Sequence, residues 1–474
     1  MKLFSSQTLI IENLKRFAFL LIIPLGLSGC MIENKNENSA VLSSDTGDIS
    51  LFAATDGING AELWSSDGTE SGTVLVKDIN TTASTGSSPS VIDNLGPIRS
   101  VVLNGFVYFS ATDATHGTEL WKSDGTEAGT VLIKDINTTA SSNPNQFTLF
   151  NNAIYFSADD GINGNELWKT DGTESGTVLV PGIDLAMTSS ATPLAASSNV
   201  LFFNVSNSYT VKAELWTTDG TTTGLVKEIG GNINWPVVLN NTLYFQGTDT
   251  TSGIELWLSN GTPSGTTIIK DINPGTNDST PIHLVAFNNK IYFQANDGTN
   301  GYELWVSDGT SVGTTMVENL AAGSASSDPK DMIVFGSKLY FSANNLTNGK
   351  ELFVLNETGT TIELVKDINT TPNISEWSQP DNFIEFNNNL YFRANDGVNG
   401  YELWKTNGTE SGTLLVKDIN IGSTPSNATP KVIANNKLFI IANDGTNGSE
   451  LWTSDGTAIG TTLVKDINPA GSAF

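Results

Sequence analysis

The stretch 303–310 reads Glu-Leu-Trp-Val-Ser-Asp-Gly-Thr, and its opening Glu-Leu-Trp returns along the whole chain. There are nine copies, one of them Glu-Leu-Phe, at intervals of 41 to 57 residues, and five of the eight intervals are 47 or 48. A period of this length, with short apolar runs between turn residues, is typical of propellers and stacked arrays. The copies, which number the repeats, begin at Glu62, Glu119, Glu166, Glu214, Glu255, Glu303, Glu351, Glu402 and Glu450.

Each repeat predicts four short antiparallel strands, and the sixth copy has the plainest pattern. Asn288-Asn289 between two apolar runs predicts a two-residue hairpin turn, because asparagine tolerates the positive φ angles of such turns. The Asp-Gly-Thr segment predicts a second turn. The expected strands cover 283–287, 290–295, 302–307 and 314–317.

The second expected strand of a repeat is apolar on both faces, as in Ile291-Tyr292-Phe293 and Leu339-Tyr340-Phe341. Both faces of such a sheet must be covered, and radial packing of like sheets does so. A linear array would need distinct caps, and the sequence has no obvious cap segment. We therefore predict an all-β chain in which residues 40–474 form a single β-propeller. It has eight or nine four-stranded antiparallel blades, built from nine ~48-residue repeats.

The N-terminal residues have the features of an export signal. Lys15 and Arg16 precede an apolar run over 17–25, as in secretory signal peptides. The next residues, Leu27-Ser28-Gly29-Cys30, resemble the bacterial lipobox, in which the cysteine is acylated and becomes the first residue of the mature lipoprotein.

This resemblance implies a lipoprotein signal peptide over 1–29, lipidation at Cys30 and a lipidated tether over 30–39. Met31 follows the cysteine in place of Asp, which implies onward export to the outer membrane or cell surface. The expected partner is therefore a membrane, reached through the lipid anchor. Cys30 is the only cysteine, so the chain cannot form an intrachain disulfide.

The chain is strongly acidic, with a formal net charge of −27. Removing residues 1–29 takes away three basic residues and one acidic residue, which leaves 20 basic against 49 acidic residues and a net charge of −29. Affinity for nucleic acid depends on phosphate neutralisation by Lys and Arg. This composition therefore excludes DNA and RNA as expected partners.

The recurring Glu-Leu-Trp-x-x-Asp-Gly-Thr string resembles a bacterial repeat family named for that motif, from about residue 49 to the end. Members of that family are generally exported proteins of undetermined biochemical role. The resemblance therefore implies a fold and a location without a reaction. The turn and strand pattern is also similar, more loosely, to kelch propeller blades.

A lysine follows the glutamate of most repeats at a spacing of fifteen residues. If the six-residue loop 67–72 joins two strands, Glu62 lies opposite Lys77, and opposite charges across strands contribute ~0.2–1 kcal/mol. We therefore expect cross-strand pairs that are mainly structural. The other expected pairs are Glu119/Lys134, Glu214/Lys227 at a spacing of thirteen, Glu255/Lys270, Glu351/Lys366, Glu402/Lys417 and Glu450/Lys465.

Two repeats lack this lysine. Pro181 replaces it in repeat three, and Glu318 replaces it in repeat six, where it is expected to face Glu303. Two facing carboxylates raise one pKa or bind a cation. Glu303 and Glu318 are thus the candidate metal ligands.

The loop 297–301, Asp-Gly-Thr-Asn-Gly, recurs at 56–60, 160–164, 396–400 and 444–448. Its oxygen-bearing residues permit a Ca²⁺ site, but it lacks the fuller carboxylate set and the terminal Glu of an EF-hand loop. A tight turn stabilised by Asp and Gly explains the pattern equally well. Calcium is the one cofactor that the sequence raises.

Three aromatic residues outside the repeat pattern are candidate ligand-binding residues. Trp235 and Trp377 lie in linkers that lead into a first strand, and Tyr209 replaces the usual Asp-Gly loop of repeat four. Aromatic rings at such positions can stack on sugars or anchor a protein, although a tryptophan folded over a blade edge fits the same pattern. The other eight tryptophans lie in the repeat and are expected to pack between blades.

The sequence supports a binding protein better than an enzyme, and no catalytic residue stands out. The chain has only two histidines, His116 and His283, and after residue 29 only two arginines, Arg99 and Arg393. So few histidines and arginines argue against nucleophile–base pairs, zinc sites and the arginine cluster of a sialidase. We expect a surface-displayed interaction scaffold for a protein, glycan or envelope component. The alternatives are a polysaccharide hydrolase or lyase that uses channel carboxylates and a purely structural envelope protein.

Overall fold

The computed structural model describes residues 41–42, 49–82, 86–90, 100–183, 189–207, 210–371 and 377–474. All the regular elements in these residues are β-strands. No helix in this part of the chain is long and apolar enough to cross a membrane. The prediction of an all-β chain of four-stranded antiparallel sheets is confirmed for most repeats. Cys30, the expected signal peptide, the tether and Tyr209 lie outside the described residues.

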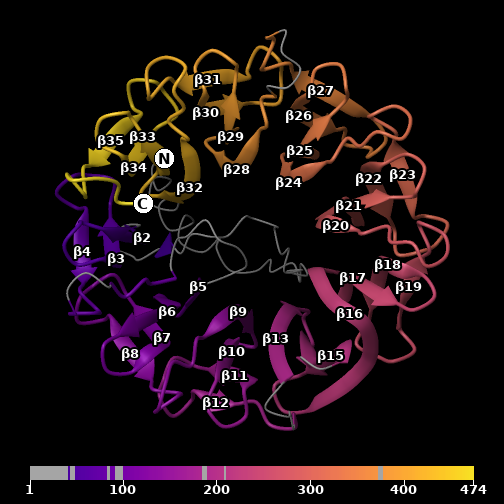
Figure 1. Cartoon of the computed structure of the whole chain (residues 1–474), viewed down its shortest axis with the longest axis horizontal. Helices are drawn as coiled ribbons and strands as arrows, with labels where there is room; N and C mark the ends of the chain where they lie inside the picture. The colour runs from indigo at the N-terminus through magenta and orange to yellow at the C-terminus, as the bar shows by residue number, and fades with distance from the viewer. Residues whose placement is uncertain are drawn as a thin grey trace, which may run out of the picture. The chain divides into compact units, whose positions relative to one another are not determined.

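Six sheets contain four strands each, arranged antiparallel in chain order (Figure 1). The first two belong to repeats one and two: β1 (Val41–Leu42), β2 (Ile49–Thr55), β3 (Ala61–Ser66) and β4 (Val74–Lys77), then β5 (Ser100–Leu103), β6 (Phe106–Asp113), β7 (Gly117–Ser123) and β8 (Val131–Lys134).

The sheets of repeats six and seven follow the same order. They consist of β20 (Ile282–Phe287), β21 (Lys290–Asn296), β22 (Tyr302–Ser307) and β23 (Thr315–Glu318), then β24 (Lys330–Phe335), β25 (Lys338–Asn344), β26 (Lys350–Leu355) and β27 (Ile362–Lys366).

Repeats eight and nine complete the set of six. Their strands are β28 (Asp381–Phe386), β29 (Asn389–Asn395), β30 (Tyr401–Thr406) and β31 (Leu414–Lys417), then β32 (Thr429–Ala434), β33 (Lys437–Asn443), β34 (Ser449–Ser454) and β35 (Thr462–Lys465).

Repeats three, four and five share one mixed 11-stranded sheet instead of three separate sheets. Asn165 pairs in parallel with Ser190 to join repeats three and four. The interval from Glu214 to Glu255 is the shortest in the chain, so one strand serves repeats four and five without a linker.

That strand is β16 (Thr223–Leu239), which pairs with both β15 and β17. The sheet consists of β9 (Asn145–Phe150), β10 (Ala153–Asp159), β11 (Asn165–Thr170), β12 (Val178–Leu179), β13 (Ser189–Ala196), β14 (Leu201–Asn207), β15 (Thr210–Thr218), β16, β17 (Thr242–Asp249), β18 (Gly253–Ser259) and β19 (Thr266–Lys270).

The asparagine pairs form the hairpin turns that the sequence predicts. Asn288 and Asn289 have φ angles of 48° and 59° between β20 and β21. Such positive φ values suit the twist of a two-residue hairpin. The same conformation occurs at Asn151–Asn152, Asn240–Asn241, Asn387–Asn388 and Asn435–Asn436.

The Leu and Trp of the repeat pack against two different neighbouring sheets, as expected. Leu63 lies in one apolar cluster with Trp121 and Phe109 of repeat two. Trp64 lies in another cluster, with Val432 and Phe439 of repeat nine. Side chains alternate between the faces of a strand, so consecutive residues reach opposite neighbours.

The contacts of the last repeat return to the first. Lys437 Nζ donates to the Gly68 carbonyl at 2.8 Å, and the Thr55 N–H donates to the Ala473 carbonyl at 3.0 Å. Figure 1 shows the yellow strands of repeat nine beside the indigo strands of repeat one, in agreement with their shared apolar cluster. The described residues all belong to one compact unit.

The predicted Glu–Lys pairs across the third and fourth strands are wrong. Ser65 pairs with Val74 near the turn as expected, but a β-bulge then shifts the register, so that Lys77 lies opposite Leu63. A bulge places two residues opposite one, and the lysine therefore faces the next repeat. Lys77 Nζ donates to the Thr130 carbonyl at 2.7 Å and lies 6.0 Å from the centre of the Trp121 ring.

This lysine contact recurs between neighbouring repeats. A cation over an aromatic face adds ~0.5–1 kcal/mol at exposed sites and more when desolvated. In each case Nζ donates to a threonine carbonyl of the next repeat, at 2.7–3.0 Å. The other pairs are Lys227–Thr266, Lys270–Thr314, Lys366–Thr413, Lys417–Thr461 and Lys465–Thr73.

The buried glutamate of the motif holds the linker that leads to the next sheet. Glu351 is fully buried, and its carboxylate accepts the N–H groups of Ile368 and Asn369 and the hydroxyl of Ser378. A buried charge is tolerated when hydrogen-bond donors surround it. The same glutamate–serine bond joins Glu62–Ser87, Glu119–Ser142, Glu255–Ser279, Glu303–Ser327 and Glu402–Ser426.

The raised pKa values of the buried glutamates predict that the stability of the fold decreases as the pH rises. Burial raises the pKa of Glu255, Glu351 and Glu450 from 4.5 to about 7. The folded chain therefore holds protons that the unfolded chain has released, and this stabilisation is present below about pH 4.5 and lost as the pH rises through about 7. We expect the Tm measured by calorimetry to decrease from pH 5 to pH 8. Glu450→Gln should reduce this slope, whereas a Tm that increases over the range would contradict the prediction.

Candidate functional site

The two predicted metal ligands of repeat six do not face each other. Glu318 is exposed and lies opposite Leu304, because the bulge recurs in β23. Glu303 is fully buried and accepts hydrogen bonds from Leu320, Ala321 and Ser327. The facing register on which the cation hypothesis rested is therefore wrong.

The Asp-Gly loops form tight turns by their own hydrogen bonds. Asp297 accepts the N–H groups of Thr299 and Asn300 and the side-chain amide of Asn300. Burial acts to raise the pKa of Asp297, but these hydrogen bonds outweigh it and lower the pKa. No group of three His, Cys, Asp or Glu side chains that could hold a metal occurs among the described residues. Calcium binding here stays a prediction.

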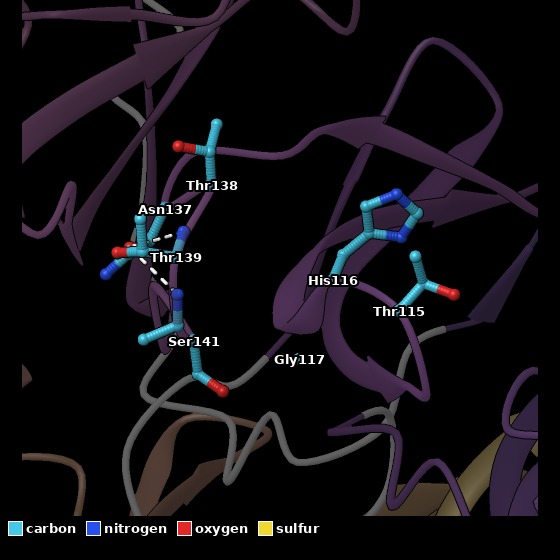
Figure 2. Close-up of a pocket in the computed structure, with 8 residues that line it drawn as sticks. Thr115, His116, Gly117, Asn137, Thr138, Thr139 and Ser141 are labelled. Carbon is cyan, nitrogen blue, oxygen red and sulfur yellow. Dashed lines mark hydrogen bonds between the residues drawn. The ribbon is translucent and has the colours of Figure 1, made fainter.

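A polar cavity of about 250 Å³ lies beside His116 in repeat two (Figure 2). Thr115 and His116, on the loop before β7, form one wall, and residues 137–141 after β8 form the other. Ser141 Oγ accepts the Thr118 N–H at 2.9 Å, which holds the two walls together. His116 Nδ1 lies 2.8 Å from Asp113 Oδ2, and this hydrogen bond raises the pKa of His116. The cavity thus offers hydroxyl and amide groups and one imidazole that protonates readily.

A second group of side chains, most of them polar or charged, includes Trp235. This tryptophan is 42% exposed, and its ring centre lies 4.6 Å from that of His283 in repeat six. Both residues have left-handed backbone, with φ angles of 53° and 57°, at irregularities in the first strand of their repeats. Burial, and then the charges of Lys330 and Lys350, lower the pKa of His283 to about 4. His283 is therefore neutral at physiological pH.

Repeat seven contributes two lysines and an aspartate. Lys330 Nζ lies 3.5 Å from Asp331 Oδ2. Burial raises the pKa of Asp331, and burial followed by repulsion from Lys330 lowers the pKa of Lys350. Lys350 Nζ makes no hydrogen bond or ion pair with any other described residue.

Repeat eight contributes a two-bond ion pair. Arg393 Nε donates to Asp381 Oδ1 at 2.9 Å, and Arg393 Nη2 donates to Oδ2 at 2.6 Å. The guanidinium also lies 5.2 Å from the ring centre of Tyr401. Such two-point pairs are strong and fix the geometry of both partners.

These residues act on one another and together form what we term the charged cluster: Trp235, His283, Lys330, Asp331, Lys350, Asp381, Arg393 and Tyr401. Burial and then the charge of Asp381 in repeat eight raise the pKa of Asp331 in repeat seven. The hydrogen bond and charge of Asp381, and then the charge of Asp331, raise the pKa of Arg393 against the effect of burial. The strands that carry most of the cluster, β16, β20, β24 and β28, contact one another in that order (Figure 1). Small or uncharged residues hold the corresponding strand starts elsewhere, such as Asn145, Asn165, Thr429 and Ser449.

The structure places two of the three predicted aromatic residues near this cluster. Trp235 belongs to it. Trp377 is half-buried and covers Gly349, next to Lys350, so closely that a Cβ on Gly349 would lie 2.5 Å from the indole. Trp377 thus matches the alternative of a ring folded over an edge, at the border of the cluster.

The sequence reading did not identify the lysines, aspartates, Arg393 and Tyr401 of the cluster. A comparison of equivalent positions between repeats could have found the charged residues, because only repeats seven and eight have charges where the others have uncharged residues. The total numbers of Lys and Asp in the chain do not reveal these charges at particular positions.

Comparisons with known proteins show only distant structural likenesses. No protein-family model matches the sequence, and no curated protein matches it. Among solved structures, a computationally designed protein aligns with 74% of this chain and 94% of its own, at 16% identity and a TM-score of 0.42. A puromycin hydrolase aligns with 75% of this chain and 58% of its own, at 12% identity and a TM-score of 0.41.

An oligogalacturonate lyase in complex with manganese aligns with 66% of this chain and 86% of its own, at 12% identity and a TM-score of 0.37. The alignment with the puromycin hydrolase covers little more than half of that protein's length. We draw no functional conclusion from likenesses of this size.

The two histidines should titrate far apart. His116 is expected to protonate above its ordinary pKa of 6.5 because of Asp113, and His283 near pH 4 because of burial. NMR titration of the imidazole signals measures both, and His116→Gln and His283→Gln assign them. Asp113→Asn should lower the pKa of His116 and leave His283 unchanged. Coincident titration of both rings near pH 6.5 would contradict these environments.

Proposed function

We propose that the nine repeats close into a nine-bladed β-propeller that belongs to the Glu-Leu-Trp-x-x-Asp-Gly-Thr repeat family. The contacts between repeats nine and one support closure: Lys465 Nζ donates to the Thr73 carbonyl at 2.8 Å and lies 5.8 Å from the Trp64 ring centre. Repeats eight and nine make the same kind of contact through Lys417. The junction is therefore chemically equivalent to an internal one.

We further propose that the chain is an exported bacterial lipoprotein, anchored through Cys30 and displayed at the outer membrane or cell surface as a binding scaffold. The sequence Leu27-Ser28-Gly29-Cys30 and the acidic composition support export and display. The expected partners are the membrane, through the anchor, and a protein, glycan or other envelope component.

The charged cluster carries the binding proposal. The polar residues of the repeat are occupied in construction: the glutamates hold linkers, the lysines reach the next repeat, and the loop aspartates stabilise turns. The cluster instead combines charges and an exposed indole at positions where most other repeats have uncharged residues. Such exceptions to a repeat are available for recognition, as in other repeat proteins that bind through their variable positions.

The alternative function, a polysaccharide hydrolase or lyase, requires two free carboxylates. The two carboxylates of the cluster, Asp331 and Asp381, each have a cationic partner, and the repeat glutamates are mostly fully buried. We therefore favour binding over catalysis.

Capture of native envelope material tests the proposal. The full chain, in detergent, should retain a soluble or solubilised component of the native envelope, and Trp235→Ala with Lys350→Met should abolish retention. Gln146→Ala with Asn165→Ala is the matched control, because these residues occupy the equivalent positions of repeat three. No capture, or equal capture by all three proteins, would contradict a binding function at this cluster.

A further inference from the structure

Lys350 is the one cation of the charged cluster that makes no direct hydrogen bond or ion pair with a described residue. Arg393 is held by Asp381 through two bonds, and Lys330 lies beside Asp331. Lys350 is half-buried at the start of β26, where the charge of Lys330 repels its ammonium and the charges of Asp328 and Asp331 attract it. A partly desolvated cation that no carboxylate contacts directly is stabilised further by an incoming anion.

The surroundings of Lys350 limit the chemistry of that anion. His283 is neutral, so its ring offers one N–H donor and one acceptor. Its ring nitrogens make no hydrogen bond to another described residue. A ligand with both a carboxylate and hydroxyl groups would match the ammonium and the imidazole together.

Trp235 adds a flat apolar surface to this set. Its ring is partly exposed and fixed by its tilted contact with His283, at an angle of 58° between the planes. The indole offers a large, rigid contact area at low entropic cost. Sugar rings present a face of C–H groups with hydroxyls at the edge, which fits an aromatic ring bordered by polar groups.

We propose that the charged cluster binds a carboxylated sugar unit of an acidic glycan, with its ring on Trp235 and its carboxylate at Lys350. His283 hydrogen-bonds a hydroxyl of the same unit. Lys330 and Arg393 keep Asp331 and Asp381 neutralised, so these aspartates do not repel the incoming carboxylate. The inference rests on the proposed binding function and names its ligand class.

Calorimetric titration of the full chain with two matched trisaccharides tests this inference. The β-1,4-linked trimers of glucuronic acid and of glucose differ only in carboxylate against hydroxymethyl. We expect binding of the acidic trimer only, at least ~10-fold weaker in Lys350→Met, which corresponds to ~1.4 kcal/mol. Trp235→Ala should weaken it similarly, while Gln146→Ala and Asn165→Ala should bind as the unaltered chain does. Circular dichroism melting checks that each variant is folded.

Three results would overturn the inference: equal affinity for both trimers, unchanged affinity in Lys350→Met, or binding of a Glu-Glu-Glu peptide in place of either sugar. The capture experiment with native envelope material distinguishes failure of the carboxylated-sugar inference from failure of the proposed binding function. If cluster-dependent capture persists but is removed by protease, the ligand is a protein, and only the carboxylated-sugar inference fails. If capture is absent as well, both fail.

Discussion

A buried carboxylate in most repeats fixes how one sheet leads to the next. In most copies the glutamate of the Glu-Leu-Trp motif is fully buried, and it accepts backbone N–H groups and usually a serine hydroxyl from the following linker. An unpaired charge in this position would be costly, so the linker must take the path that supplies these donors. The first strand of the next repeat then starts at a defined place, and Lys330, Asp331 and Asp381 lie near such starts.

The Leu and Trp of the motif supply the other half of the construction. They point to opposite faces, and each sheet is thereby covered by two neighbours. The lysine at the end of the fourth strand adds a polar contact to the same boundary, over the tryptophan of the next repeat. These contacts hold the lysines between repeats.

Period, strand pattern and turn chemistry could be predicted from the sequence, because they depend on local spacing. The asparagine turns and the packing of the tryptophans agree with the structure. The partner of the glutamate could not be predicted, since a single bulged residue at Val76 moves Lys77 to another pairing position. The fusion of repeats four and five depends on one strand, β16, whose length no periodicity reveals. The fusion of repeats three and four depends on the single parallel pair Asn165–Ser190. Trp235 can be singled out in the sequence because it is a rare residue outside the motif, whereas Lys350, at the start of β26, resembles an ordinary surface lysine.

Lys350 and Glu351 are adjacent in the chain, and we assign recognition to the first and construction of the fold to the second. Paired measurements on variants of both residues test directly whether these two roles are separate. Unfolding in denaturant and retention of the captured envelope ligand are measured for Glu351→Gln and Lys350→Asn. Glu351→Gln should lower the free energy of unfolding by ~1–3 kcal/mol and retain the ligand while folded. Lys350→Asn should change the free energy of unfolding by less than ~0.5 kcal/mol and lose the ligand. Equal destabilisation by both variants, or retention of ligand by Lys350→Asn, would contradict the division between construction and recognition.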